Sequence, residues 1–146
     1  MLVSEELYSR IVQVMPIPCV DLLVVDEVEK ILLLLRRNEP AARQWWLPGG
    51  RVHFGETRAD AAVRKLNEEC GLKAISTQEL GTFDVLIELQ EIQGLSHGIT
   101  TVFKIKVVNQ TATTLDGQSS TAAWRSKQEW LGYELHPFIQ QCLRLS

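Results

Sequence analysis

Two adjacent glutamates, Glu68 and Glu69, follow a turn that contains two glycines, Gly49 and Gly50. Glycine has no Cβ, so the backbone of this turn is able to approach a ligand closely. Carboxylates together with backbone carbonyls form an all-oxygen ligand set, which suits a hard cation that keeps some of its water molecules. These residues therefore predict a Mg²⁺ site, with Mn²⁺ as a substitute, formed by backbone carbonyls of the turn around Gly49 and Gly50 and by the carboxylates of Glu68 and Glu69.

A helix must carry the two glutamates. Thr57 and Asp60 form a capping pair that opens a helix, and Gly71 is typical of the left-handed residue that ends one. We therefore expect a helix from about Arg58 to Cys70.

The period of this helix predicts which side chains face a core. Lys65 and Glu68 fall on the opposite, solvated face, and Glu69 falls at the margin, where a carboxylate is partly buried and still reaches a cation. The apolar stripe consists of Ala59, Ala62, Val63, Leu66 and Cys70.

The charged residues of the helix have a simpler interpretation as a solvated surface. Arg64 with Glu68, and Lys65 with Glu69, are spaced for ordinary i,i+4 pairs. The glycines, Glu56 and Arg64 lie at fixed offsets from the glutamates, however, and a solvated surface does not require that spacing. The pattern favours a functional site.

The other predicted elements alternate between helices and strands. Their order alone predicts a fold of mixed α and β elements, formed by one domain over residues 1–146. A helix capped by Ser4 and a hairpin come first, an extended piece precedes the glycine turn, and strands and a last helix follow the central helix. The expected ranges are Glu5 to Val14, Val20 to Val25, Ile31 to Leu35, Trp45 to Leu47, Ala74 to Leu89 (interrupted near Gly81), His97 to Val108, Thr121 to Arg125, a capping box at Ser126 and Glu129, and a helix starting at Pro137.

Composition excludes several classes of protein. The 146 residues are 45% hydrophobic and 23% charged, as in an ordinary globular domain. The net charge of −3 argues against a general nucleic-acid binder. Three unpatterned cysteines indicate reduced thiols, and the apolar run from Ile31 to Leu35 is too short to span a bilayer. We expect a cytoplasmic protein that binds neither nucleic acid nor a membrane.

The window from Gly50 to Leu72 resembles the signature of the Nudix hydrolases, G-x5-E-x7-R-E-U-x-E-E-x-G-U, in which U is a bulky aliphatic residue. Only Lys65 departs from it. The resemblance implies the Nudix fold, so we expect an α/β/α sandwich around a mixed β-sheet. It also implies the hydrolysis of a nucleoside diphosphate linked to another moiety, and catalytic roles for Arg51, Arg64, Glu68 and Glu69. The matching positions are Gly50, Glu56, Arg64, Leu66, Glu68, Glu69, Gly71 and Leu72.

The stretch from Pro16 to Val52 also resembles one Nudix branch, the GDP-mannose mannosyl hydrolases. These enzymes release the sugar by substitution at its carbon, whereas most Nudix enzymes attack phosphorus. The resemblance implies that Asp21 helps to hold the substrate and that Arg36 and Arg51 contact the diphosphate. It also implies that Gln118 is a further metal ligand.

Two positions depart from that branch. Ser119 stands where the branch has its general base, a histidine, and serine is a poor base near neutral pH. The chain also keeps Glu68, which the branch has largely given up. His97 aligns with a histidine of the branch and is a candidate for substrate contact, whereas His136 fits a helix cap beside Pro137.

The lysine at the misfit position changes the electrostatics of the site. A lysine in place of the first glutamate removes one ligand and changes the local charge by two units, so fewer metal ions should bind. Attack at the anomeric carbon tolerates this change, because its main requirement is to neutralise the departing diphosphate.

Three functions therefore remain open. The first is Mg²⁺-dependent hydrolysis of a nucleotide sugar such as GDP-mannose to the free sugar and a nucleoside diphosphate. The second is a conventional Nudix pyrophosphatase that splits the P-O-P link of a nucleotide sugar or nucleoside triphosphate. The third is a module that binds a nucleotide without turnover. The expected partner is a small nucleotide, and the branch resemblance also implies a homodimer through Leu2 to Val14.

Overall fold

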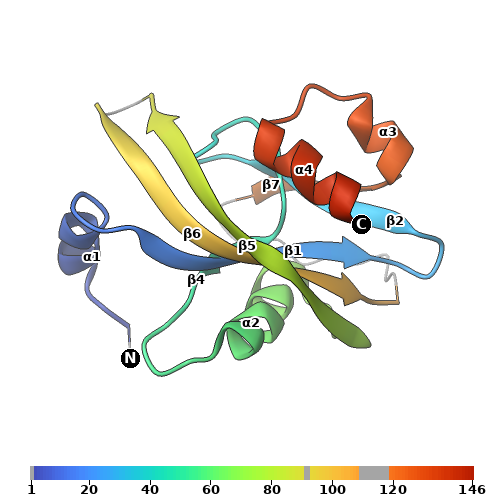
Figure 1. Ribbon diagram of the computed structural model, residues 1–146, viewed down its shortest axis with the longest axis horizontal. Coiled ribbons are helices and arrows are strands. Elements are labelled where there is room, and N and C mark those ends of the chain that lie inside the picture. Colours follow the sequence, from blue (N-terminus) through green and yellow to red (C-terminus); the bar gives the residue numbers. More distant parts are fainter. Residues whose placement is uncertain (1, 91–92, 109–118) are drawn as a thin grey trace.

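The computed structural model describes residues 2–90, 93–108 and 119–146, with the backbone alone for residues 119 and 120. Figure 1 shows a twisted sheet with helices on both faces. The elements in chain order are α1 (Glu5–Ile11), β1 (Ile17–Val25), β2 (Lys30–Arg36), β3 (Trp45–Trp46), β4 (Gly49–Arg51), α2 (Arg58–Cys70), β5 (Ser76–Leu89), β6 (Gly94–Lys106), β7 (Ser119–Ser126), α3 (Lys127–Leu131) and α4 (Pro137–Leu145).

The described strands form one mixed sheet of seven strands, in which the order β3-β2-β1-β6-β5 is continuous. β4 additionally pairs with β1, and β7 with β2. β1 and β6 run parallel, so that Asp21 lies opposite Val102, and the hairpin partners β1 and β2 run antiparallel. The long pair β5 and β6 shifts register between Glu79 and Gly81, where the sequence predicts an interruption.

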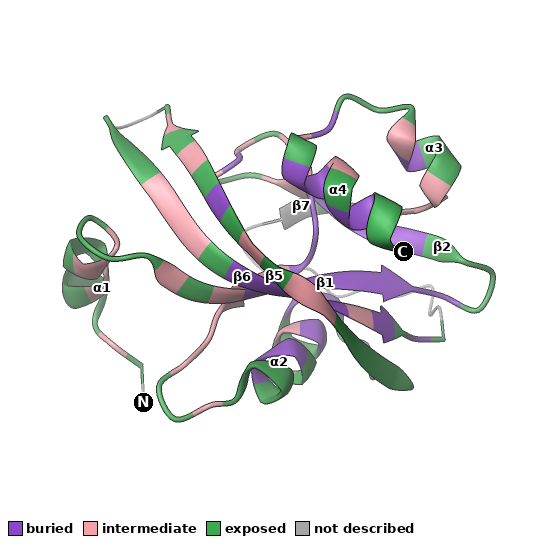
Figure 2. Cartoon of the chain, viewed as in Figure 1, coloured by how far each residue is buried: buried purple, intermediate pink, exposed green. Residues whose placement is uncertain are grey.

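Both faces of the central strands are covered, which explains why β1 and β2 are nearly continuous apolar runs. Alternate side chains of these strands belong to two cores, one under α2 and one under α3 and α4. Figure 2 shows β1 buried along the part that passes between these layers. The core under α3 and α4 includes Leu23, Val25, Ile31, Leu33, Trp130, Ile139 and Leu143, and the core under α2 includes Val20, Leu22, Val24, Leu32, Ala62 and Leu66. The expected α/β/α sandwich is confirmed.

The capping signals are confirmed at every helix where the sequence predicts one. The Thr57 side chain accepts a hydrogen bond from the Asp60 backbone N–H, and Gly71 is left-handed with φ of 65°. The Ser126 capping box is present, and His136 caps α4. α1 starts after Ser4 as expected but ends at Ile11, earlier than the predicted Val14.

The predicted buried stripe of α2 is partly wrong. Ala59 is exposed and Val63 is 49% exposed, whereas Ala61 and Glu69 are buried. The helix is rotated so that Glu69 faces the glycine turn, whose backbone satisfies part of the carboxylate. Lys65 was expected on the solvated face, but its side chain is only 14% exposed because it lies over Gly50.

Two further features concern the thiols and the length of the helices. All three cysteines are free. Across the described ranges, no helix has both the length and the apolar character needed to cross a membrane.

Candidate active site

The glycine turn is fixed by pairing with the central strand of the sheet. In the antiparallel pair of β4 with β1, Gly49 lies opposite Asp21 and Gly50 opposite Val20. A Cβ on Gly49 would lie only 2.2 Å from the Val20 carbonyl oxygen, so no other residue fits there. This close approach places the turn next to α2, which carries the glutamates.

Arg64 connects α2 to β4 and to the loop between them. Its Nε donates to Glu56 Oε2 at 2.7 Å and its Nη2 to Glu56 Oε1 at 2.9 Å, which is a two-pronged contact. Nη2 also donates to the Arg51 carbonyl oxygen at 3.1 Å, and Nη1 to Glu68 Oε2 at 3.1 Å. The hydrogen bonds from Arg64 lower the pKa of Glu56 to about 2. Arg64 therefore holds both the Glu68 side chain and the backbone of β4 in place.

Glu69 is the most enclosed carboxylate of the cluster. The residue is 5% exposed, and its Oε2 accepts a hydrogen bond from the Gly49 backbone N–H at 3.4 Å. The Lys65 Nζ lies 3.1 Å from Glu69 Oε1 and 3.6 Å from Glu68 Oε2. An ammonium therefore stands between the two carboxylates that are the candidate metal ligands.

Asp21 lies beside this cluster, at the centre of the sheet. The carboxyl is buried, and Oδ2 accepts a hydrogen bond of 2.6 Å from the Thr100 hydroxyl. Burial raises the pKa of Asp21 to about 6, against the opposing effects of Thr100, the positive charge of Arg36 and a hydrogen bond with Trp46. The positive charge of Arg36, on the neighbouring strand β2, thus acts on the Asp21 carboxyl. The substrate roles of both residues stay predictions.

The two arginines expected to contact a diphosphate are held in different ways. Arg36 Nε donates to the Pro40 carbonyl oxygen at 2.7 Å, and the backbone of β7 begins opposite Arg36, at Ser119. The Arg51 guanidinium lies 4.7 Å from the ring centroid of Tyr8, on α1. Sequence reasoning missed Tyr8, because nothing local links it to a residue 43 positions later.

Other predicted residues are separate from the cluster or outside the described part. His97 precedes Val102 by five positions, which places it roughly 17 Å along β6 from the strand position opposite Asp21. Gln118 lies outside the described residues, and of Ser119 only the backbone is described. His97 and Gln118 stay predictions.

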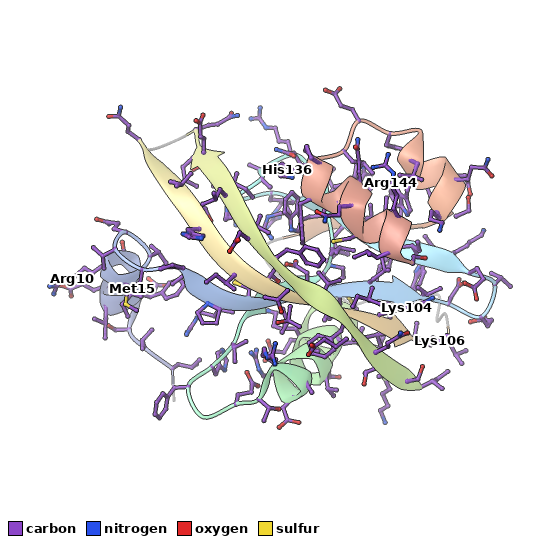
Figure 3. The ribbon with its side chains drawn as sticks, in the orientation of Figure 1. Arg10, Met15, Lys104, Lys106, His136 and Arg144 are labelled. Atoms are coloured by element: carbon purple, nitrogen blue, oxygen red, sulfur yellow. The ribbon has the colours of Figure 1, made fainter. Side chains whose placement is uncertain are left out.

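The tryptophan pair before the turn serves the core. Trp45 contacts Trp130 with ring centroids 5.1 Å apart, and Trp46 contacts Phe138 at 5.8 Å. Trp46 also contacts His136 with ring centroids 5.2 Å apart. His136 is the cap of α4 and is labelled beside that helix in Figure 3. These contacts link β3, and hence the turn that follows it, to the layer of α3 and α4.

The donor set fits one hydrated divalent ion. Glu68 and Glu69 are successive residues of one helix, and Gly49 is close enough to hydrogen-bond Glu69. In the part of the chain that the structure describes, no group of three or more His, Cys, Asp or Glu side chains is arranged for a metal. Mg²⁺ keeps several waters and commonly uses only one or two carboxylates, so this small set matches its chemistry.

Comparison with known protein families assigns the chain to a class of enzyme, the hydrolases of nucleoside diphosphate derivatives that work with a divalent metal ion. The sequence model of the family described as NUDIX domain matches residues 15–144. The chain therefore belongs to the Nudix family, which confirms the resemblance noted from the signature.

Individual relatives support the fold over nearly the whole chain. The low-salt glycan biosynthesis protein Agl8 of Haloferax volcanii is 29% identical over 143 residues, which cover 97% of this chain and 88% of that protein. The MutT protein of Methanosarcina mazei Go1 superposes with a TM-score of 0.74 at 25% identity, covering 90% of this chain and 93% of that one. The NUDIX domain of Shewanella oneidensis NrtR, solved with ADP ribose, gives a TM-score of 0.74 at 19% identity and covers 98% and 96% of the two chains.

Proposed function

We propose that this Nudix hydrolase cleaves a nucleotide sugar, such as GDP-mannose, to the free sugar and a nucleoside diphosphate, with Mg²⁺ or, in its place, Mn²⁺. The observation that carries the proposal is the Lys65 ammonium between Glu68 and Glu69. It reduces the capacity of the site for metal ions, which a carbon-centred substitution tolerates better than attack on phosphorus. The glycan biosynthesis name of the Haloferax volcanii relative is consistent with a sugar-containing substrate.

The bound metal ion would be held by Glu68, Glu69 and the Gly49 carbonyl, with Gln118 as a further ligand, and would neutralise charge on the departing diphosphate. Arg36 and Arg51 donate hydrogen bonds to the diphosphate oxygens, which guanidinium groups bind in pairs.

Asp21 gives the site a second buried carboxyl next to the glycine turn, beside that of Glu69. In this proposal it accepts a hydrogen bond from the sugar, and His97 contacts an outer part of the substrate. Arg64 does not touch the substrate, because Glu56, Glu68 and the Arg51 carbonyl occupy its donors. It keeps Glu68 and β4 in place.

A conventional pyrophosphatase is the second candidate, and two observations favour it. Glu68 is retained on the edge of the cluster, with 48% of its side chain exposed, where a second carboxylate would serve phosphorus attack. Ser119 also leaves the general base of the mannosyl branch without a counterpart. A third candidate is a binding module without turnover.

Hydrolysis of a panel of nucleotide sugars in ¹⁸O-labelled water distinguishes the three. Substitution at the anomeric carbon forms a bond from the water oxygen to that carbon and breaks the bond from the carbon to the diphosphate oxygen. The label then appears in the free sugar, which is the result we expect. Label in a phosphate product supports the pyrophosphatase, and no turnover of any compound supports the binding module.

Glu69→Gln tests the metal assignment. We expect a loss of at least about 100-fold in Mg²⁺-dependent activity, because even substitutions outside the first ligand shell commonly cost 10-fold to 100-fold. Glu134→Gln, which changes an exposed glutamate on the loop before α4, is the matched control and should keep full activity. Unchanged activity in Glu69→Gln would remove Glu69 from the metal site.

A homodimer through the N-terminal segment is part of the same proposal. α1 buries none of its residues, and Leu2 and Val14 at the ends of the segment are 68% and 78% exposed. Sedimentation at assay concentration should give the mass of two chains, and Leu7→Glu on α1 should shift the protein to the mass of one. A single-chain mass for the unaltered protein contradicts this part of the proposal.

A further inference from the structure

The Lys65 side chain is built into the glutamate cluster instead of lying on its surface. Its aliphatic stem passes over Gly50, where an added Cβ would lie 2.7 Å from Lys65 Cε and 3.2 Å from Nζ. Only 14% of the side chain is exposed. Lys65 and Gly50 are therefore matched to each other: the absence of a side chain at position 50 provides the space that the lysine fills.

The Lys65 ammonium also compensates the charge of a buried carboxylate. Glu69 is buried, and a buried carboxylate is costly unless a cation or hydrogen bonds compensate it. The Lys65 Nζ supplies that cation at 3.1 Å, and it lies 3.6 Å from Glu68 as well. Arg64, the other nearby cation, points its donors at Glu56, the Arg51 carbonyl and Glu68 Oε2, and none of these contacts is with Glu69.

We propose that the Lys65 ammonium is a permanent internal cation that takes the place of a second divalent metal ion and limits the glutamate cluster to one. The inference rests on the proposed function only in so far as Glu68 and Glu69 are metal ligands. A second divalent ion beside these carboxylates would stand next to the ammonium, and like charges at that separation repel strongly in a partly buried site. The lysine thus acts as a positioning residue that holds Glu69 and sets the metal count.

Counting bound Mn²⁺ ions tests the inference without any substrate. Mn²⁺ is added to the full chain, and the free ion is measured by electron paramagnetic resonance. We expect one bound ion per chain for the unaltered protein and for Lys65→Arg, which keeps the charge. Lys65→Glu, which replaces the cation by a further ligand, should bind one ion more.

The matched control is Arg144→Glu, which makes the same change of two charge units at an exposed residue of α4. Figure 3 labels Arg144 on this helix, and α4 covers the sheet face opposite α2. This variant should still bind one ion. Two or more ions on the unaltered protein, an unchanged count in Lys65→Glu, or an equal gain in Arg144→Glu would each overturn the inference.

Thermal melting in EDTA supplies a second readout that does not depend on counting. Lys65→Met keeps the stem over Gly50 and removes the charge, so the buried Glu69 loses its cation. We expect a lower melting temperature than for the unaltered protein in EDTA, and a larger upward shift on adding Mg²⁺. Equal melting temperatures and equal Mg²⁺ shifts would show that Lys65 does not stand in for a metal ion.

These measurements fail independently of the proposed reaction. If the ion counts are as expected and the ¹⁸O label appears in phosphate, the carbon-centred reaction is wrong and the role of Lys65 stands. If the label appears in the sugar and the unaltered protein binds two ions, the role of Lys65 is wrong and the reaction stands.

Discussion

At the scale of single residues, the signature contains two groups. One group consists of candidate metal ligands, and the other holds those ligands in place. Both Glu56 carboxylate oxygens accept hydrogen bonds from Arg64, and Glu56 Oε1 also accepts one from the His53 backbone N–H. Glu56 therefore fixes Arg64, which in turn fixes Glu68 and the Arg51 carbonyl. A spacing that looks like a set of metal ligands is partly a set of supports.

Glu56→Gln tests this supporting role through its pH dependence. Hydrogen bonds from Arg64 lower the pKa of folded Glu56 from 4.5 to about 2. Its stabilising effect is therefore complete above the unfolded pKa and is lost as the pH falls toward the folded one. We expect Glu56→Gln to lower the free energy of unfolding by about 2 kcal/mol at pH 7. In urea denaturation this difference should shrink between pH 5 and pH 3, and a difference independent of pH would contradict the role.

The site residues that the sequence predicts lie close together in the chain, whereas those that it misses have partners far away in the chain. Glu56, Arg64, Glu68 and Glu69 were predicted because one local spacing contains them all. Thr100, which donates to Asp21, was missed because the two residues lie 79 positions apart. Such a partner becomes visible only when the parallel pairing of β1 with β6 is known.

At the scale of elements, α2 shows where local signals end. Its first and last residues follow from Thr57 and Gly71, since capping is decided within a few residues. Its rotation does not follow from the helical period, because Glu69 is drawn inward by the Gly49 backbone and by Lys65. The helical period places Glu69 only at the margin of the apolar stripe, because it takes no account of the backbone group and the cation that draw the carboxylate further inward.

α1 illustrates a second element-scale effect, the support of an arginine from outside the sandwich. Tyr8 places its ring under Arg51, and such a contact contributes about 0.5 to 1 kcal/mol when partly exposed. We expect Tyr8→Ala to raise the KM for a nucleotide sugar by about 3-fold, with little change in kcat, because Arg51 binds the diphosphate less firmly.

Two further variants of α1 separate the ring from the rest of the helix. Tyr8→Phe keeps the aromatic face and should have a KM close to that of the unaltered protein. Glu6→Ala, which changes an exposed neighbour on α1, should have no effect. If Tyr8→Phe raises KM as much as Tyr8→Ala, the hydroxyl rather than the ring supports the site.

At the scale of the whole molecule, the layers and the hairpin of β1 with β2 were predictable, whereas the other strand pairings were not. Apolar runs at β1 and β2 indicate burial on both faces, and flanking helices follow from that. The insertion of β4 beside β1 depends on a contact between residues almost 30 positions apart, and the apolar pattern contains no signal for it. That insertion nevertheless decides the site, because it places Gly49 opposite Asp21.

The position of Asp21 in the central strand couples function to the stability of the whole fold. Burial raises the pKa of Asp21 from 3.8 to about 6. The native state therefore binds a proton more tightly than the unfolded chain does, and this contribution to stability is full below pH 3.8 and is lost as the pH rises through 6. At neutral pH the molecule retains a buried charge at a cost in stability, which is consistent with the proposed contact between Asp21 and the substrate.

Asp21→Asn separates these two effects. Asparagine is neutral at every pH and still accepts a hydrogen bond from Thr100, so the variant should be more stable than the unaltered protein at pH 8. Its advantage should diminish by about 3 kcal/mol on going from pH 8 to pH 4, as followed by urea denaturation. Hydrolysis of the nucleotide sugar should fall at the same time. Asp84→Asn, at an exposed position of β5, should change neither quantity. If the difference in the free energy of unfolding between the variant and the unaltered protein stays constant between pH 4 and pH 8, the ionised Asp21 carboxylate does not destabilise the fold.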